Sequence, residues 1–288
     1  MWVSEFDRTL FSICLDKRAE RRYNSFSRAS IAQVVEQWTE NPRVGGSSPP
    51  RGSEKAESKL AFSLFRYMDK NRLLLELHQE IRGCPLCRLA ETRTHAVPGE
   101  GNFQAQLMFV GEGPGENEDL SGRPFIGAAG SFLNELLARA GIARNDVFIT
   151  NIVKCRPPRN RDPLPDEVAA CNDYLMAQIA LIEPKFVVTL GSPAMKTLIS
   201  AKLQISKVRC QVFRKSGIFF VPLFHPAAAL HNKSLVATLQ NDILRLKELI
   251  ARPLRDDEII DLSPPRMDEE PQPKESQKES DEPELSLF

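Results

Sequence analysis

Short apolar runs alternate with amphipathic stretches through the central part of the chain. Four runs rich in β-branched and aromatic residues predict buried strands: LMFVGE (107–112), DVFITNIVK (146–154), KFVVTLG (185–191) and IFFVPLFH (218–225). Apolar residues at helical spacing predict helices at about 69–82, 130–141, 165–182, 192–201 and 234–251. This alternation predicts an α/β fold with three α/β/α layers and a central, mostly parallel four-stranded sheet.

The two ends of the chain depart from this pattern. Residues 1–67 are rich in Ser, Arg and Pro, which predicts a disordered leader. The alternative is a wrongly assigned start codon, with Met68 as the true start. Codons for Gly-Ser-Ser-Pro at 46–49 can contain TTCGA, a sequence typical of transfer-RNA genes, so the leader would be the translation of such a gene. After Arg252 the chain has six prolines and dense charge. This predicts a disordered acidic tail over 252–288 and one folded domain over 68–251.

The zero net charge hides an uneven distribution. Residues 255–288 carry 12 acidic and 4 basic side chains, which leaves 34 basic and 26 acidic side chains in residues 1–254. A basic body suggests a polyanionic partner such as nucleic acid, although many proteins of this size share such a surplus. No apolar run approaches the roughly 20 residues of a membrane span, and acidic residues near the start argue against a secretory signal. We therefore expect a cytoplasmic, nucleoid-associated monomer without a membrane partner.

A glycine-rich turn, VGEGPGENEDLSGRPFIGAAG (110–130), joins the first predicted strand to a helical stretch. Such turns often bind phosphate, but this one has no lysine, and Glu116 stands where a dinucleotide turn needs its third glycine. The four acidic residues of the turn would also repel a phosphate. The turn therefore favours a flat, polar ligand with less charge.

Polar residues or glycines mark the ends of all four predicted strands. Glu112 and Gly113 follow the first strand, Asn151 lies late in the second, Gly191 ends the third and His225 ends the fourth. Open parallel sheets bind ligands at the carboxyl ends of their strands, near the point where the strand order reverses. We therefore expect these residues to converge on one cleft.

Four of the six cysteines have spacings typical of ligands. Cys84 and Cys87 form a C-x2-C motif, Cys155 follows the second strand, and Cys171 lies on the predicted helix after it. Four thiolates bind either zinc or an iron–sulfur cluster, and the spacing alone does not choose between them. Cys14 and Cys210 are expected to be packed thiols.

Together these stretches resemble the family 4 uracil-DNA glycosylases, the iron–sulfur type of the uracil glycosylase superfamily. The resemblance covers about Met68–Leu249 and is carried, in order, by CPLC, GEGN, VGEGPGENEDLSGRPFIGAAG, FITNIVKCRPPRNRDP, PDEVAAC, LIEPKFVVTLG, ISKVR and HPAAAL. It implies a base excision repair enzyme that rotates uracil out of DNA and hydrolyses its N-glycosidic bond, leaving an abasic site. It also implies a structural [4Fe-4S] cluster on Cys84, Cys87, Cys155 and Cys171.

The resemblance implies roles for four residues of the expected cleft. Phe125 stacks on the base, and the Asn151 carboxamide accepts a hydrogen bond from N3–H and donates one to O4. Cytosine presents the opposite pattern and would leave buried polar groups unpaired. Glu118 closes the space beside C5 and so excludes thymine. His225 donates to O2, where negative charge develops as the bond breaks.

The nucleophilic water has no obvious general base in this sequence. Related family 1 enzymes carry an aspartate where this chain has Gly113, and Glu112 is expected to hold the turn. We infer a dissociative reaction in which a backbone carbonyl of the 112–115 turn, together with Asn160, positions the water. The alternative is a carboxylate base at Glu112, which a rate loss in Glu112→Gln that grows with pH would favour.

Basic residues near the strand ends are expected to bind DNA phosphates. They are Lys154, Arg156, Arg159, Arg161, Lys207 and Arg209. Leu230 is the expected wedge that fills the gap left by the rotated base. It lies in the segment 229–233, where this chain has Ala-Leu-His-Asn-Lys and the family often has Leu-Leu-Arg-Asn-Pro.

The chain ends in ELSLF, which resembles the QL[S/D]LF peptide that bacterial replication and repair proteins use to bind the sliding clamp. Leu285, Leu287 and Phe288 would enter an apolar pocket of the clamp. Glu284 in place of glutamine should weaken this binding.

Two other functions remain open. The first is excision of another deaminated base, hypoxanthine or xanthine, by the same kind of pocket. The second is a catalytically silent iron–sulfur module that binds DNA through the basic loops. The joint presence of Phe125, Asn151 and His225 argues against the second.

Overall fold

The computed structural model describes residues 70–262. The expected leader over 1–67, the alternative start at Met68, Cys14 and the ELSLF tail lie outside the described residues. Within them, no helix is both long and apolar enough to cross a membrane.

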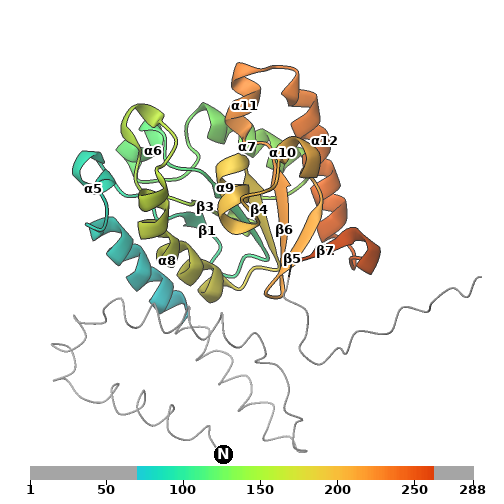
Figure 1. Cartoon of the computed structure of the whole chain (residues 1–288), viewed down its shortest axis with the longest axis horizontal. Coiled ribbons are helices and arrows are strands. Elements are labelled where there is room, and N and C mark those ends of the chain that lie inside the picture. Colours follow the sequence, from blue (N-terminus) through green and yellow to red (C-terminus); the bar gives the residue numbers. More distant parts are fainter. Residues whose placement is uncertain (1–69, 263–288) are drawn as a thin grey trace, which may run out of the picture.

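A seven-stranded sheet forms the centre of the described domain (Figure 1). Its strands are β1 (Glu100–Gly101), β2 (Leu107–Gly111), β3 (Phe148–Asn151), β4 (Phe186–Leu190), β5 (Val212–Lys215), β6 (Ile218–Leu223) and β7 (Ile259–Asp261). Their order is β1-β3-β2-β4-β6-β5-β7. The four predicted strands, β2, β3, β4 and β6, pair in parallel at its centre. The prediction of a mostly parallel sheet is confirmed, but the predicted count of four strands is too low.

The three additional strands lie at the two sides of the parallel core. β1 pairs antiparallel with β3, β5 pairs antiparallel with β6, and β7 pairs with β5. They are short and only partly buried, so the sequence lacks the continuous apolar run that marks the central strands. β7 also moves the end of the domain from residue 251 to Leu262, inside the segment that was expected to be disordered.

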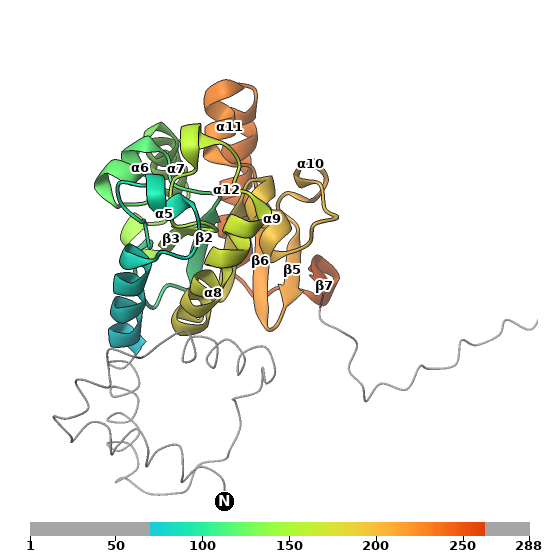
Figure 2. The same ribbon diagram turned by 60° about the vertical axis from the view of Figure 1, so that its left-hand side comes forward.

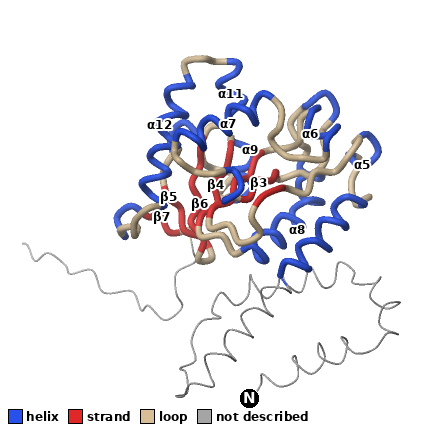
Figure 3. Tube along the Cα trace, turned by 180° about the vertical axis from the view of Figure 1, so that it is seen from behind, coloured by secondary structure: helices blue, strands red, loops and turns tan. Residues whose placement is uncertain are grey.

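Helices cover both faces of the sheet, as the three views show (Figures 1–3). They are a helix over 70–83, α5 (Leu89–Thr92), α6 (Glu116–Ser121), α7 (Ala128–Arg139), α8 (Pro165–Ile182), α9 (Ser192–Leu198), α10 (Ile205–Val208), α11 (Pro226–His231) and α12 (Leu235–Ile250). Three short 3₁₀ helices are η1 (Arg144–Asp146), η2 (Pro158–Asn160) and η3 (Asp256–Glu258). The five predicted helices are present, whereas α5, α6, α10 and α11 are too short to show a period in the sequence.

Two apolar cores, one on each face of the sheet, hold the layers together. Met108 and Val110 of β2 face the core shared with the helix over 70–83, α8 and α9. The alternate residues Leu107 and Phe109 face the core shared with α7 and α12. Successive side chains of a strand point to opposite faces, so a strand that is apolar throughout can serve both cores.

The strand order reverses at β2, because β3 lies on one side of it and β4 on the other. The carboxyl ends of the four parallel strands therefore form the edge where ligands of such sheets bind. Both ends of the described chain lie at the opposite edge (Figure 1). The helix over 70–83 runs toward the carboxyl ends of the parallel strands. β5 is antiparallel to β6, and β7 is parallel to β5, so β7 runs away from those ends.

Candidate active site

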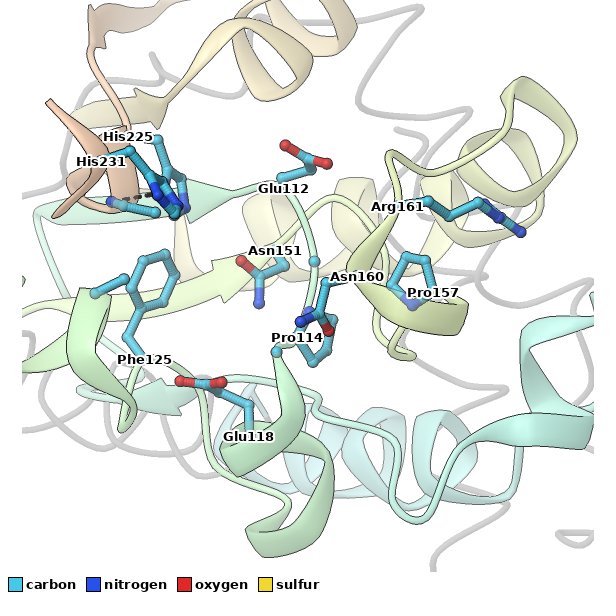
Figure 4. A pocket seen from close by; sticks show the side chains of 14 residues that line it. Glu112, Pro114, Glu118, Phe125, Asn151, Pro157, Asn160, Arg161, His225 and His231 are labelled. Carbon is cyan, nitrogen blue, oxygen red and sulfur yellow. Dashed lines mark hydrogen bonds between the residues drawn. The ribbon is translucent and has the colours of Figure 1, made fainter. Parts of the chain in front are cut away.

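A pocket of about 340 Å³ opens at the carboxyl ends of the parallel strands (Figure 4). Its lining includes Glu112 and Gly113 after β2, Asn151 at the end of β3, and His225 after β6. Gly191, at the end of β4, packs directly behind His225, since a Cβ atom there would lie 3.1 Å from the His225 Cβ. The structure thus brings together the residues that were expected to converge.

Close packing around Gly111 and Phe125 shapes the floor of the pocket. A Cβ atom on Gly111 would lie 2.5 Å from Asn151 Oδ1 and 2.6 Å from the Phe125 ring, so only glycine lets the two side chains meet there. Phe125 has a positive φ of 50° and is 5% exposed. Its ring centroid lies 5.6 Å from that of His225, with 33° between the planes. A non-glycine residue with positive φ is uncommon outside turns and functional sites. At Phe125 this backbone conformation turns the ring toward the pocket.

The Asn151 carboxamide lies at the back of the pocket and is 1% exposed. Its Oδ1 atom is buried without a hydrogen-bond partner among residues 70–262. Buried carbonyl oxygens are nearly always paired, and one without a partner costs about 1–3 kcal/mol of stability. An oxygen kept in this state at a cavity wall is suited to accept a hydrogen bond from a ligand.

His225 caps the amino terminus of α11 through one nitrogen of its ring. The Ala227 amide donates to His225 Nδ1 at 3.1 Å. Burial lowers the pKa of His225 to about 4, so the ring is neutral near pH 7. Because Nδ1 accepts a hydrogen bond, the single proton of the neutral ring belongs on Nε2. The cap therefore leaves His225 with one donor, on the nitrogen not used by the cap.

Two neighbouring carboxylates of α6 fasten the glycine-rich turn. Glu118 Oε1 accepts from the amides of Ile126 and Gly127 at 2.9 Å and 2.8 Å. The buried Asp119 carboxylate accepts from the Thr94 amide at 2.9 Å and 3.0 Å. Glu118 thus lines the pocket while it holds the segment that follows Phe125.

Glu112 carries the most perturbed carboxyl group of the pocket. Burial first, and then the charge and hydrogen bond of Asp162, raise the pKa of Glu112 to about 7. The backbone carbonyl of Glu112 accepts from the Val153 amide at 3.2 Å, and that of Gly115 accepts from the Asp119 amide at 2.9 Å. Two carbonyls of the turn that was expected to position the water are therefore already engaged, and an ionisable carboxyl group stands beside them.

The segment after Cys155 forms the opposite wall. Arg156 Nε donates to Asn160 Oδ1 at 2.7 Å, which orients the Asn160 side chain at the pocket. Arg161 also lines the pocket, but its guanidinium points away from the centre (Figure 4). It forms a bidentate pair with the fully buried Glu167 at 2.6 Å and 2.8 Å. Arg161 therefore orders the start of α8, and its donors on Glu167 are not directed at a phosphate.

Lys154 does not lie on a DNA-facing surface, so the prediction that it binds phosphate is wrong. It is 1% exposed, and its ammonium donates to Thr150 Oγ1, Asn151 O and Gln178 Oε1. Burial lowers the pKa of Lys154 to about 7, and the neighbouring Cys171 and Cys155 thiols act in the opposite direction. The polar sequence KCRPPRNR predicted a surface loop, but its first residue turns inward beneath β3.

The remaining basic residues differ in their exposure and in their ion pairs. Arg159 and Lys207 are exposed. Arg209 is also exposed, although it pairs with the buried Asp242. Leu230 on α11 is 48% exposed, so its side chain is free to contact a ligand. Cys210, expected to be a packed thiol, is 3% exposed.

The four motif cysteines gather behind the pocket wall. Cys84, Cys155 and Cys171 are buried, and Cys87 is partly exposed. Burial raises the pKa of the Cys155 thiol, and Cys87 and Cys84 add to this shift. Burial likewise raises the pKa of Cys171 to about 12, with further contributions from Cys155 and Cys84. The thiols therefore lie within electrostatic range of one another, and Arg93 donates to Cys155 Sγ at 3.0 Å.

The thiols do not converge on one point. Among residues 70–262 no three potential ligand side chains lie close enough to hold a single metal ion. Four neighbouring thiols that are too far apart for one zinc ion match a cluster with several irons better, because each iron of a [4Fe-4S] cluster takes its own cysteine. The cysteines of this chain therefore fit such a cluster.

Two polar residues in or beside the pocket, His231 and Asp162, had no assigned role in the sequence. His231 lines the pocket from the end of α11, and its spacing of four residues from Ala227 is the helical signal that could have revealed it. Asp162 lies beside Glu112 only because the η2 turn brings it back to the end of β2, and no local pattern predicts that.

Comparison with known proteins identifies the family of this chain. The family described as the uracil DNA glycosylase superfamily matches residues 98–249. The type-4 uracil-DNA glycosylase of Sulfurisphaera tokodaii is 46% identical over 191 residues, which cover 63% of this chain and 87% of that protein. Proteins of the same description from Saccharolobus solfataricus and Thermotoga maritima are 44% and 43% identical, over 63% and 64% of this chain and 88% and 97% of their own lengths. The chain therefore belongs to the uracil DNA glycosylase superfamily, and within it to the type-4 uracil-DNA glycosylases.

Proposed function

We propose that this protein removes uracil from DNA by hydrolysing the N-glycosidic bond. The observation that carries the proposal is the carboxamide oxygen of the pocket residue Asn151, which is buried without a partner among residues 70–262. Uracil offers the missing donor at N3. A buried base cannot be attacked within the duplex, so the nucleotide is first rotated out into the pocket.

The direct test is incubation with oligonucleotides that carry uracil, hypoxanthine or xanthine, in single-stranded and double-stranded form. We expect an abasic site at uracil. A larger yield of abasic product from hypoxanthine or xanthine than from uracil would mean that uracil is not the preferred substrate. The absence of abasic product from all three would favour the catalytically silent DNA-binding module.

The other walls of the pocket supply the remaining recognition. Phe125 stacks on the ring, and His225 Nε2–H donates to O2 as negative charge develops there. Glu118, held by the Ile126 and Gly127 amides, occupies the space beside C5 and leaves no room for the methyl group of thymine. Release of thymine by Glu118→Ala, measured on a thymine-containing duplex, tests that last role.

Glu112 is the group that orients the water when it is ionised. Its pKa of about 7 lies near the value at which a base is most effective at neutral pH. The Gly113 backbone and Asn160 complete the water site, since both line the same side of the pocket. The bond breaks largely before the water adds, so this activation contributes less than the donor at O2.

Glu112→Gln provides the pH test of this role. At about pH 6 only roughly a tenth of the wild-type carboxyl groups are ionised, so the rate deficit of the variant should be about tenfold smaller there than at about pH 8. At about pH 8 Glu112 is ionised, and the variant should be slower by about 10- to 100-fold. Single-turnover rates across this range measure the difference. Equal rates at both pH values would assign the water to the backbone carbonyls alone.

The four cysteines bind a [4Fe-4S] cluster in this proposal. The cluster joins the end of the helix over 70–83 to the segment after β3 and to α8, and hydrolysis does not require it to change oxidation state. The proximity of the thiols supports this assignment, as does the similarity to type-4 relatives.

DNA binds across the carboxyl edge of the sheet. Exposed Arg159, Lys207 and Arg209, together with the less exposed Arg156, contact phosphates, and the exposed Leu230 replaces the rotated base in the stack. We further propose that the protein acts as a monomer on chromosomal DNA in the cytoplasm.

The terminal ELSLF peptide binds a bacterial sliding clamp in our proposal. Burial of Leu285, Leu287 and Phe288 would contribute roughly 1.5–3 kcal/mol for each side chain before ordering costs, enough for micromolar binding. We expect the full chain to bind the clamp and the double variant Leu287→Ala, Phe288→Ala not to bind. Uracil excision on short oligonucleotides should be unchanged in that variant. Identical flat titrations for both proteins would contradict the idea.

A further inference from the structure

Lys154 is the centre of a buried polar network. All three protons of its ammonium are used, at 2.6 Å to Thr150 Oγ1, 2.9 Å to Asn151 O and 2.7 Å to Gln178 Oε1. A side chain with this cost of burial is retained only where its contacts are needed. Two of its three acceptors belong to the last two residues of β3.

The network continues beyond the ammonium and joins three other parts of the domain. Thr150 Oγ1 donates to the Pro98 carbonyl at 2.8 Å, and Gln178 Nε2 donates to the same carbonyl at 2.8 Å. Gln178 also lies 3.4 Å from His78 Nε2. The end of β3 is thereby held against α8, the loop before β1 and the helix over 70–83.

The same lysine lies against the cysteine site. Its backbone amide donates to Cys171 Sγ at 3.3 Å, and its carbonyl accepts from the Val97 amide at 2.7 Å. Cys155 is the next residue in the chain. One residue therefore contacts the thiols through its main chain and the carbonyl of the base-reading Asn151 through its side chain.

We propose that Lys154 is a positioning residue that couples the cysteine site to the base-reading end of β3. Its ammonium fixes the backbone of Asn151, so that the Asn151 carboxamide faces the pocket. It also places a positive charge near Cys155 and Cys171 of the cysteine site. This inference rests on the proposed function for its kinetic readout, and two of its readouts do not depend on activity.

The first experiment removes one of the three acceptors. Thr150→Val deletes the hydroxyl at nearly constant volume, and Thr189→Val is the matched control. Both threonines are fully buried and pair with Val110 from opposite sides, but Thr189 Oγ1 has no partner among the described residues. We expect about tenfold lower kcat on uracil-containing DNA for Thr150→Val, with an unchanged KM, and less than twofold change for the control. Equal kcat values for the two variants would overturn the proposal.

The second experiment removes the ammonium. Lys154→Met should lower kcat about 100-fold and move the cluster's reduction potential to more negative values, since a nearby positive charge favours the reduced form. Arg159→Met is the surface control, which should reduce the slope of log affinity against log salt by about one while Lys154→Met leaves that slope unchanged. An unchanged potential together with a reduced salt slope in Lys154→Met would overturn the proposal. The potential and the salt slope remain informative even if the wild type releases no uracil, which would contradict the proposed function alone.

Discussion

Replacement of His225 by asparagine should slow uracil excision by about 10²- to 10³-fold, which is the usual cost of losing one donor to a developing negative charge. The physical reason lies in how the ring is used. Nδ1 accepts from the Ala227 amide, so the proton on Nε2 is free for the O2 atom of uracil. That bond strengthens as negative charge moves to O2, and it therefore stabilises the transition state more than the bound substrate.

Asparagine is chosen because it separates catalysis from folding. Its side-chain oxygen can accept from the Ala227 amide as Nδ1 does, and asparagine is among the best residues at the start of a helix. It is too short to reach O2. His225→Ala loses both contacts and should unfold at a lower temperature, because loss of a helix cap costs about 1 kcal/mol. Single-turnover excision and thermal melts of both variants measure the two effects. Excision by His225→Asn within tenfold of the wild type would contradict the role.

Replacement of Asn151 by leucine should abolish most uracil excision and leave the protein at least as stable as the wild type. Excision should fall by about 10³-fold or more, because a site that reads a base edge by hydrogen bonds loses that recognition completely. Stability should hold or increase, because the unpaired Oδ1 atom is removed and leucine has the same number and branching of side-chain heavy atoms. The two effects have opposite signs and the same cause.

The rate of uracil excision and the free energy of unfolding should be measured on one preparation of the Asn151→Leu variant. Excision of uracil, compared with cytosine in the same sequence context, gives the loss of recognition. Denaturant unfolding gives the change in stability. A variant with lower stability and normal selectivity would mean that Asn151 supports the fold, whereas a more stable and inactive variant would identify a residue kept for its ligand.

The parallel core and the position of the pocket were predictable because each rests on a long, regular signal. Phe186–Leu190 and its counterparts are buried on both faces, so their sequences are apolar throughout. Once the strands are known, Glu112, Asn151 and His225 must lie at one edge, since each follows the carboxyl end of a parallel strand. Their roles in base recognition were predicted from the resemblance to the glycosylase family.

The errors have equally specific causes. β1 and β7 are two and three residues long, too short for an alternation to appear. Lys154 was placed on the surface because lysine is rarely buried, and only the tertiary network of Thr150 and Gln178 reveals its acceptors. The raised pKa of Glu112 depends on Asp162, fifty residues later in the chain, so no local pattern could supply the missing carboxylate at the water site.

The chain enters and leaves the described domain at the edge of the sheet opposite the pocket. An attachment at residue 70 or residue 262 therefore projects away from the bound DNA. A fluorophore, a surface anchor or a second enzyme could be joined at either end without passing between the pocket and its substrate. This geometry suits the domain to single-molecule imaging on stretched DNA and to fusion proteins that detect uracil in situ.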